Sequence, residues 1–176
     1  MSTRSCELVY LDVGSNIGDS LHTFASHRPE ARLRETLRVA GAANYQTATT
    51  CAFGFEPNPQ HTAKLQAMQA RLTPKFANLT VYTETAVGGP EQVAAPMWLV
   101  VAGGKSGVGS YLTTKRPASE RATPVRTFRL SSWLREFLAP RIGPRVPVVM
   151  RADVEGVEHE SLLTWERELQ PGGIEL

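Results

Sequence analysis

The stretch that decides the fold is Leu8-Val9-Tyr10-Leu11-Asp12-Val13-Gly14-Ser15-Asn16-Ile17-Gly18. Its first six residues form a mainly apolar, β-prone run without alternation, which is typical of a strand buried on both faces of a parallel sheet. Gly14 allows the backbone to turn sharply after this strand. Residues 17–25 then show a helical pattern, with Asp19 and Ser20 near the start, where acidic and hydroxyl side chains stabilise a helix. The stretch therefore predicts a strand, a tight turn and a helix.

The alternation of strands and helices continues outward from this stretch. Further helices are expected at residues 29–41, 60–72, 133–138 and 158–169, and further strands at 51–55, 79–83, 97–102, 125–130 and 148–153, with another beginning at 174–176. This order predicts an α/β fold with a mainly parallel sheet and helices on both faces. The strands at 97–102 and 125–130 form an inserted β stretch before the fourth core strand. A length of 176 residues suits a single domain spanning residues 1–176.

Charge and hydropathy exclude several partner classes. Nineteen Lys and Arg residues stand against 17 Asp and Glu residues, which is too balanced for a nucleic-acid-binding face. No run approaches the roughly 20 apolar residues of a membrane helix, so no membrane insertion is expected. Residues 1–7 lack the apolar run of a signal peptide, which favours a cytoplasmic location. The histidines are spaced too irregularly to indicate a metal site, and none is predicted.

The two cysteines, Cys6 and Cys51, each precede a predicted strand. If those two strands are parallel neighbours, the thiols could lie close together. Two thiols do not make the disulfide framework of a small secreted protein, and no CxxC pair suggests zinc. We therefore expect reduced, packed cysteines in a reducing compartment.

The turn at residues 12–18 has the position and the chemistry of a ligand site. Ligands of open α/β sheets bind at the carboxyl ends of strands, near the point where the strand order reverses. Gly14 allows close approach to a ligand, Gly18 allows the helix to pack on its strand, and the helix start offers N–H groups to an anion. Asp12 stands where the dinucleotide fingerprint has its first glycine. A carboxylate there would repel a pyrophosphate and suit the ammonium and sulfonium of S-adenosylmethionine, whose own carboxylate could use the loop N–H groups. The alternative is a capped helix after a tight turn, with no ligand.

Glu56, at the end of the second predicted strand, is the candidate ribose-binding residue. A carboxylate at this position can accept hydrogen bonds from ribose hydroxyls. Glu56 lies 42 residues after Gly14, whereas the usual distance is about 20 residues. The extra length matches the added helix at 29–41. The alternative is a surface glutamate beside a proline turn.

Taken together, these stretches resemble the FkbM-type methyltransferases. The resemblance covers nearly the whole chain, in the family's order. The matching pieces are Leu11-Asp12-Val13-Gly14-Ser15-Asn16-Ile17-Gly18-Asp19-Ser20, Phe55-Glu56-Pro57-Asn58-Pro59, Ala86-Val87-Gly88, Gly109-Ser110, residues 125–130 and Asp153-Val154-Glu155-Gly156-Val157-Glu158.

The resemblance implies a Rossmann-like class I fold and S-adenosylmethionine-dependent O-methylation of a hydroxyl on a small molecule or sugar. It implies that the loop holds the methionyl end of the cofactor and that Glu56 holds the ribose. The residues expected to bind the cofactor are Asp12, Gly14, Ser15, Asn16, Gly18, Glu56, Pro57, Asn58 and Ala86. An alcohol acceptor can also need a base, worth roughly 10²–10⁴-fold in rate. The candidate catalytic residues, at or after the fourth core strand, are Asp153, Glu155 and His159; an exposed helical histidine is the alternative for His159.

The chain departs from the family pattern at three points. Arg151 stands where a lysine is common, the segment between the first two motifs is longer, and the C-terminal hairpin that completes the family's sheet is expected to be missing. Two other functions remain alternatives to a methyltransferase. One is a non-catalytic or degenerate module that binds S-adenosylmethionine or a nucleotide. The other is an NAD-type oxidoreductase, which Asp12 and the absence of an obvious Tyr/Lys or Cys/His set disfavour.

Overall fold

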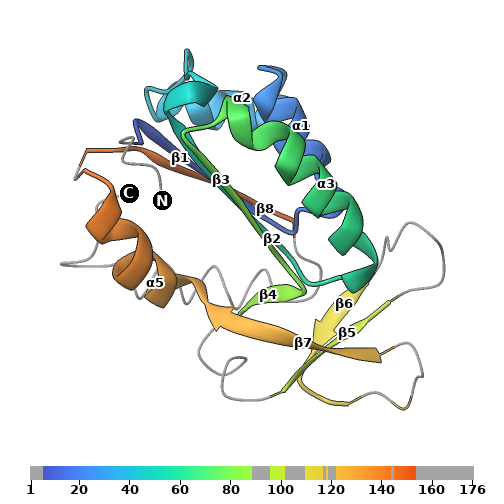
Figure 1. The fold of residues 1–176 in the computed structure, drawn as a ribbon. Coiled ribbons are helices and arrows are strands. Elements are labelled where there is room, and N and C mark those ends of the chain that lie inside the picture. Colours follow the sequence, from blue (N-terminus) through green and yellow to red (C-terminus); the bar gives the residue numbers. More distant parts are fainter. Residues whose placement is uncertain are drawn as a thin grey trace.

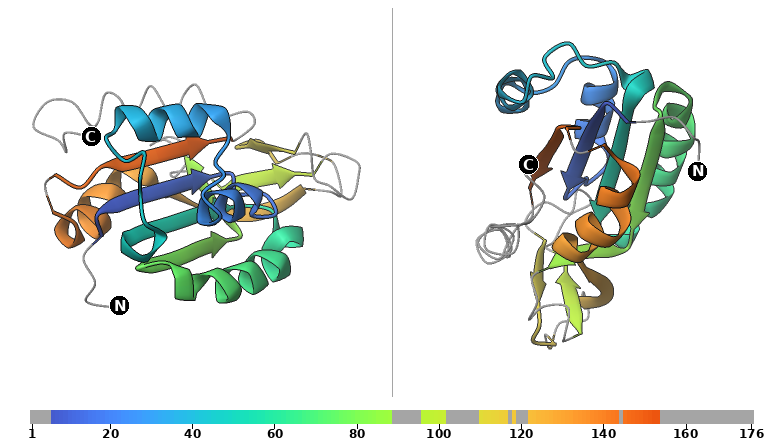
Figure 2. Two further views of the ribbon diagram at one scale, coloured as in Figure 1. Left: turned by 90° about the horizontal axis from the view of Figure 1, so that it is seen from above. Right: turned by 90° about the vertical axis from the view of Figure 1, so that its left-hand side faces the viewer.

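The structure, a computed structural model, describes residues 6–88, 96–101, 110–116, 118, 122–143 and 145–153. Its central feature is a four-stranded parallel sheet in the order β3-β2-β1-β8. The strands are β1 (Leu8–Val13), β2 (Thr50–Glu56), β3 (Asn78–Thr83) and β8 (Val148–Ala152) (Figures 1 and 2). Every residue of β1 and β2 is buried. The continuous apolar runs in the sequence therefore mark the strands that are covered on both faces.

Helices cover both faces of this sheet (Figure 1). One face carries α1 (Asp19–Ala25), α2 (Ala31–Val39) and α3 (Thr62–Leu72). The other face carries α5 (Leu130–Trp133) and the π-helical turn Leu134–Leu138 that continues it. The predicted α/β fold, with a parallel sheet and helices on both faces, is confirmed.

Alternation along the strands sorts the core into two layers. Tyr10 points towards α1, where its ring stacks on Phe24 at a centroid distance of 4.2 Å, and Phe24 stacks in turn on Tyr45. Val9 and Leu11, one residue to either side of Tyr10, point towards the layer that contains α5. Because successive side chains of a strand point to opposite faces, residues at even positions of β1 and β2 face α1 and α3.

The inserted β stretch forms a second sheet in the order β4-β7-β5-β6. Its strands are β4 (Thr85–Gly88), β5 (Met97–Val100), β6 (Tyr111–Thr113) and β7 (Ala122–Arg129) (Figure 1). Strands β5 and β7 match the predictions at 97–102 and 125–130, whereas β4 and β6 were not expected. Both missed strands are only three or four residues long, so pairing with distant strands rather than local pattern defines them.

Several helix boundaries differ from the predicted ones. The helix expected at 133–138 begins three residues earlier, at Leu130, and changes to a π-helical turn at Leu134. The helix expected at 158–169 and the strand start at 174–176 lie outside the described residues. In the part of the chain that the structure describes, no helix combines the length and apolarity needed to cross a membrane.

The cysteines are joined, which corrects the expectation of reduced thiols. Cys6 and Cys51 form a disulfide with a Cα–Cα distance of 5.5 Å. The physical reason is the parallel pairing of β1 with β2, which places Cys6, two residues before β1, beside Cys51 at the start of β2. Disulfides persist mainly in oxidising environments, so this bond does not favour a reducing compartment, and the cytoplasmic location stays a prediction.

Candidate functional site

The candidate site lies at the carboxyl ends of the parallel strands, where the order of the sheet reverses between β1 and β8. Asp12 on β1 is paired in register with Gly54 on β2 and with Arg151 on β8. Glu56 ends β2, and Asp153 directly follows β8. The sheet register thus brings residues from three distant segments to one edge.

The loop after β1 folds back onto the end of β2. The N–H groups of Gly14 and Ser15 both donate to the carbonyl oxygen of Phe55, at 2.9 and 3.0 Å. The Gly18 N–H donates to the carbonyl of Ser15 at 2.8 Å. Gly14, Asn16 and Gly18 have φ values of 84°, 52° and 89°, the left-handed region that glycine adopts without strain. These N–H groups are engaged within the protein, so the expectation that they are free for a ligand carboxylate needs correction.

Glu56 closes the loop over the strand end. Its Oε2 accepts the N–H of Asn16 at 2.6 Å, and its Oε1 accepts the N–H of Asn58 at 2.8 Å. Burial raises the pKa of Glu56 to about 7 against the effect of these two N–H groups, and the nearby charge of Asp12 adds to the rise. A carboxylate has about four lone-pair sites, so two remain for hydroxyl donors of a ligand. Glu56 is therefore a structural clamp on the loop, and its remaining lone pairs can still accept hydrogen bonds from a ligand.

Asp12 is fully buried beside the same loop. Its Oδ2 accepts the hydroxyl of Ser20 at 2.5 Å, and its Oδ1 lies 3.4 Å from the hydroxyl of Tyr10 and 3.5 Å from a guanidinium nitrogen of Arg151. Burial raises the pKa of this carboxyl, and the Ser20 and Arg151 contacts oppose the rise. The carboxylate thus links α1 to β8, and it presents no oxygen to solvent.

Arg151, next to Asp12, also lies close to two further acidic side chains. Its Nη2 lies 2.6 Å from Oδ2 of Asp153, and its Nε lies 3.5 Å from Glu30 at the start of α2. These three side chains help to line a cavity of about 420 Å³ between α2 and β8. Of the candidate catalytic residues, Asp153 is therefore tied into an ion pair, and Glu155 and His159 lie outside the described residues.

The remaining predicted cofactor residues separate into two groups. Pro57 and Asn58 follow Glu56 directly, and the Asn58 side-chain oxygen accepts the N–H of Gln60 at 3.0 Å, which caps the turn that leads into α3. Ala86, on β4, is buried in the layer that contains α5. The structure thus places Pro57 and Asn58 beside Glu56, and Ala86 on the opposite side of the sheet from the face that Asp12 and Glu56 share.

His61 lies beside Glu56 in the site, although the positions of the histidines in the sequence did not indicate a functional residue. Its side chain is 8 % exposed, and its Nδ1 lies 3.5 Å from Oε1 of Glu56. Within the described part of the chain, neither ring nitrogen has a hydrogen-bond partner, and the side-chain nitrogen of Asn58 has none either. Burial and the charge of Lys64 lower the pKa of His61. Buried polar atoms without partners are rare in folded proteins, so this corner retains hydrogen-bonding capacity that the fold itself does not use.

Gly54 is the second residue of the site that was not predicted from the sequence. A Cβ atom at this position would lie 2.8 Å from the Ser15 hydroxyl and 3.0 Å from Leu21. The loop and α1 can lie against β2 only because this strand residue has no side chain. A glycine inside an apolar strand commonly marks such a close approach, and that signal was present in the sequence.

Replacement of Gly54 by alanine is expected to lower the free energy of unfolding by about 1–3 kcal/mol, because the added methyl group overpacks the strand–loop contact. Ser15 cannot easily yield, since its hydroxyl donates to the backbone oxygen of Asp12. Chemical denaturation measures the effect. Gly143→Ala is the matched control, because its Cβ would meet its nearest neighbour at an ordinary 3.7 Å. Equal stability of the two variants would contradict the close approach.

The strand order by itself does not select a ligand. The order β3-β2-β1-β8 is that of the first four strands of dinucleotide-binding folds, and one topology serves many functions. The chemistry of the strand ends is therefore the basis for assigning a function. Comparisons of the chain with models of known protein families, with curated proteins and with solved structures find no match.

Proposed function

We propose that this chain is an S-adenosylmethionine-dependent methyltransferase of the FkbM type that acts on a hydroxyl of a small molecule or sugar. The observation that carries the proposal is Glu56, a buried carboxylate at a strand end, held by two N–H groups and with lone pairs left over. A ribose offers two adjacent hydroxyl donors, which one carboxylate can accept together.

The charges at this edge favour a cationic nucleoside over a dinucleotide. Among the described residues at the strand ends, the carboxylates of Asp12 and Asp153 contact the guanidinium of Arg151, and Glu56 adds a third carboxyl group at the end of the neighbouring strand. Such an arrangement suits an ammonium or a sulfonium and repels a pyrophosphate. Because the N–H groups of residues 14–16 are already engaged, we assign the loop to shaping the site and Glu56 to direct contact.

The chain's own contribution to methyl transfer would be positioning and proton removal. S-adenosylmethionine, when bound, supplies a methyl group on a good leaving group. Holding an acceptor hydroxyl in line with it can be worth about 7–11 kcal/mol. Among the described residues, Asp153 is the candidate that could take the hydroxyl proton, and its contact with Arg151 holds its carboxylate in a fixed orientation. Glu155 and His159 stay predictions for the same role.

A non-catalytic module that binds S-adenosylmethionine or a nucleotide is the second candidate function. The 2.6 Å ion pair between Asp153 and Arg151 favours it, because a nearby guanidinium stabilises the ionised carboxylate and weakens it as a base. Nothing in that contact hinders binding at Glu56. The two functions therefore share a cofactor site and differ in turnover.

Calorimetric titration with S-adenosylmethionine, S-adenosylhomocysteine and NAD tests the binding site. We expect the first two to bind and NAD not to bind. Glu56→Ala should weaken their binding about 10- to 150-fold, since a hydrogen bond to a charged group is worth about 1.5–3 kcal/mol. Glu136→Ala, which removes an exposed carboxylate on the α5 side, is the control and should bind as the parent does.

Equal binding by the Glu56 variant and the parent would remove Glu56 from the site and end the proposal. Formation of S-adenosylhomocysteine with a panel of hydroxyl-bearing acceptors then separates the two functions. The methyltransferase forms this product with at least one acceptor. The binding module retains the Glu56-dependent affinity and forms none.

A further inference from the structure

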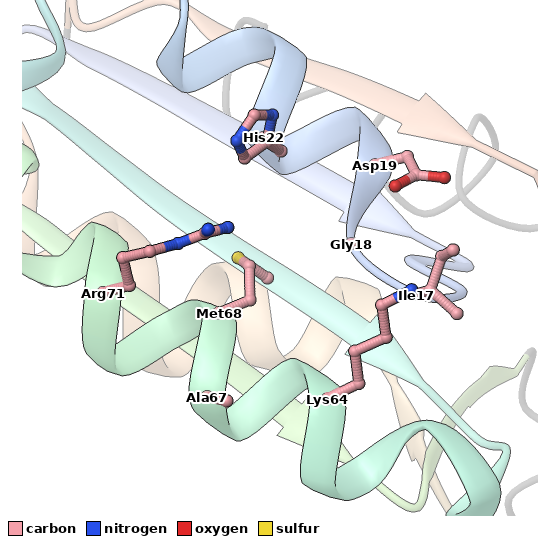
Figure 3. A pocket seen from close by; sticks show the side chains of 8 residues that line it. All are labelled: Ile17, Gly18, Asp19, His22, Lys64, Ala67, Met68 and Arg71. Carbon is pink, nitrogen blue, oxygen red and sulfur yellow. The ribbon is translucent and has the colours of Figure 1, made fainter.

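We propose that the groove between α1 and α3 binds the phosphate group of a small organic phosphate, at a site separate from the strand ends. The groove has a volume of about 360 Å³, which lies within the range of pockets for small molecules. Its polar side chains are His22 and Asp19 from α1, and Lys64 and Arg71 from α3 (Figure 3). This site goes beyond the proposed function and does not depend on it.

The floor of the groove is preformed and apolar. Gly18 and Met68 meet there so closely that a Cβ on Gly18 would lie 2.7 Å from the Met68 methyl group. Both helices are anchored to the sheet, α1 by the buried Leu21 and Phe24 and α3 by the buried Leu65. The walls of the groove are therefore held in place by the core.

Both helices contribute polar side chains with N–H donors to the lining of the groove. Lys64 and Arg71 are seven residues apart on α3, which places them about two turns apart on one face. Figure 3 shows Lys64 extending from α3 towards Ile17, just before α1, and Arg71 extending towards Met68, with His22 on α1 across from it. Asp19 is the single acidic side chain in the lining.

These basic groups have no partner of their own among the described residues. No hydrogen bond or ion pair within that part of the chain engages the side chains of His22, Lys64 or Arg71. Two arginines elsewhere have carboxylate partners: Arg38 pairs with Glu35 at 2.6 Å, and Arg151 pairs with Asp153. The groove thus holds two cationic side chains, Lys64 and Arg71, and the His22 imidazole, whose hydrogen-bonding capacity is unused within the described residues.

The combination of donors and floor indicates the ligand class. The planar fork of an arginine binds two phosphate oxygens at once, and a lysine adds a mobile point charge. The thioether of Met68 and the side chain of Ala67 provide an apolar surface for the organic part of the molecule. A phosphate ester fits both features, whereas inorganic phosphate uses only the donors.

NMR titration of the whole chain with phenyl phosphate, inorganic phosphate and phenol tests the site. We expect saturable shifts at residues 17–22 and 64–71 with phenyl phosphate, weaker binding of inorganic phosphate, and no binding of phenol. Arg71→Gln and Lys64→Gln should each weaken phenyl phosphate binding about fivefold to tenfold, because partly exposed charge pairs contribute modestly. Lys75→Gln removes the same charge at an exposed position outside the groove and should have no effect.

Absence of saturable shifts in the groove, or equal affinity of Arg71→Gln and Lys75→Gln, would overturn the proposal. Equal affinity for inorganic phosphate and phenyl phosphate would overturn the choice of an organic ligand. The two sites are tested independently. Arg71→Gln should retain S-adenosylmethionine binding, because Arg71 lies in the groove and not at the strand ends.

Discussion

Reduction of the disulfide between Cys6 and Cys51 is expected to lower the free energy of unfolding by about 4 kcal/mol. The bond joins residues 45 positions apart, and a cross-link that closes a loop of this length removes conformational entropy worth about that much from the unfolded chain. The closed loop contains β1, the loop that follows it, α1 and α2. For a domain of this size the loss corresponds to a fall in melting temperature of roughly 8–16 °C.

Calorimetric scans with and without a reductant measure this effect, with alkylation and mass spectrometry to establish the thiol state of each sample. The matched control is the double variant Cys6→Ala, Cys51→Ala, whose melting temperature should be low and unaffected by the reductant. A parent protein that melts at the same temperature in both states would show that the bond does not stabilise the fold.

The stability of the protein should depend on pH through the titration of Glu56. Burial raises its pKa from about 4.5 to about 7, so the folded state holds a proton that the unfolded state has released. Its contribution to stability is fully present below about pH 4.5 and is lost as the pH rises through 7. A difference of one pKa unit between the folded and unfolded states corresponds to 1.36 kcal/mol, so the loss in the free energy of unfolding approaches about 3 kcal/mol. Asp12, whose pKa burial also raises, acts in the same direction.

Urea denaturation between pH 5 and pH 8 tests this expectation. Glu56→Gln removes the titrating group, so the variant should gain about 2.5 kcal/mol relative to the parent across this interval. The exposed Glu136→Gln is the control and should follow the parent profile. Parallel profiles for parent and Glu56→Gln would contradict a buried, titrating Glu56.

The same titration should have the opposite effect on ligand binding. Ribose hydroxyls donate hydrogen bonds to the carboxylate form of Glu56, so cofactor affinity should rise as the pH increases through about 7. The clamp on the loop is thus least stable in the charge state that the proposed ligand prefers. In the bound state, hydrogen bonds from the ligand to the Glu56 carboxylate would offset the free-energy cost of ionising this buried group.

Much of the parallel sheet could be predicted because its signals are local. The strand at Leu8–Val13 has the bounds expected from its apolar run, and the second and third strands differ by only one residue at their ends. Leu33 and Leu37 lie on the same buried face of α2, as expected for two residues four positions apart in a helix. The short strands β4 and β6 have no such pattern, because their stability comes from partners far away in the chain.

The candidate site was predicted in part. Asp12 and Glu56 could be assigned to strand ends because strand boundaries and parallel order determine which residues share an edge. The bonds from Gly14 and Ser15 to Phe55 could not be predicted, since they depend on how the loop folds back. The same holds for His61, which reaches Glu56 only through the capped turn at the start of α3.

The sequence by itself determined the order of the strands of the parallel sheet and of the helices between them, the glycine turn after the first strand, and the acidic residues at two strand ends. Those features depend on local propensity and on periodicity, which are properties of neighbouring residues. Only the tertiary structure decided that Cys6 and Cys51 are bonded, that the loop N–H groups are engaged, and that burial raises the pKa of Glu56. Each of these depends on distances and solvent exclusion between segments remote in the chain, and no local pattern encodes them.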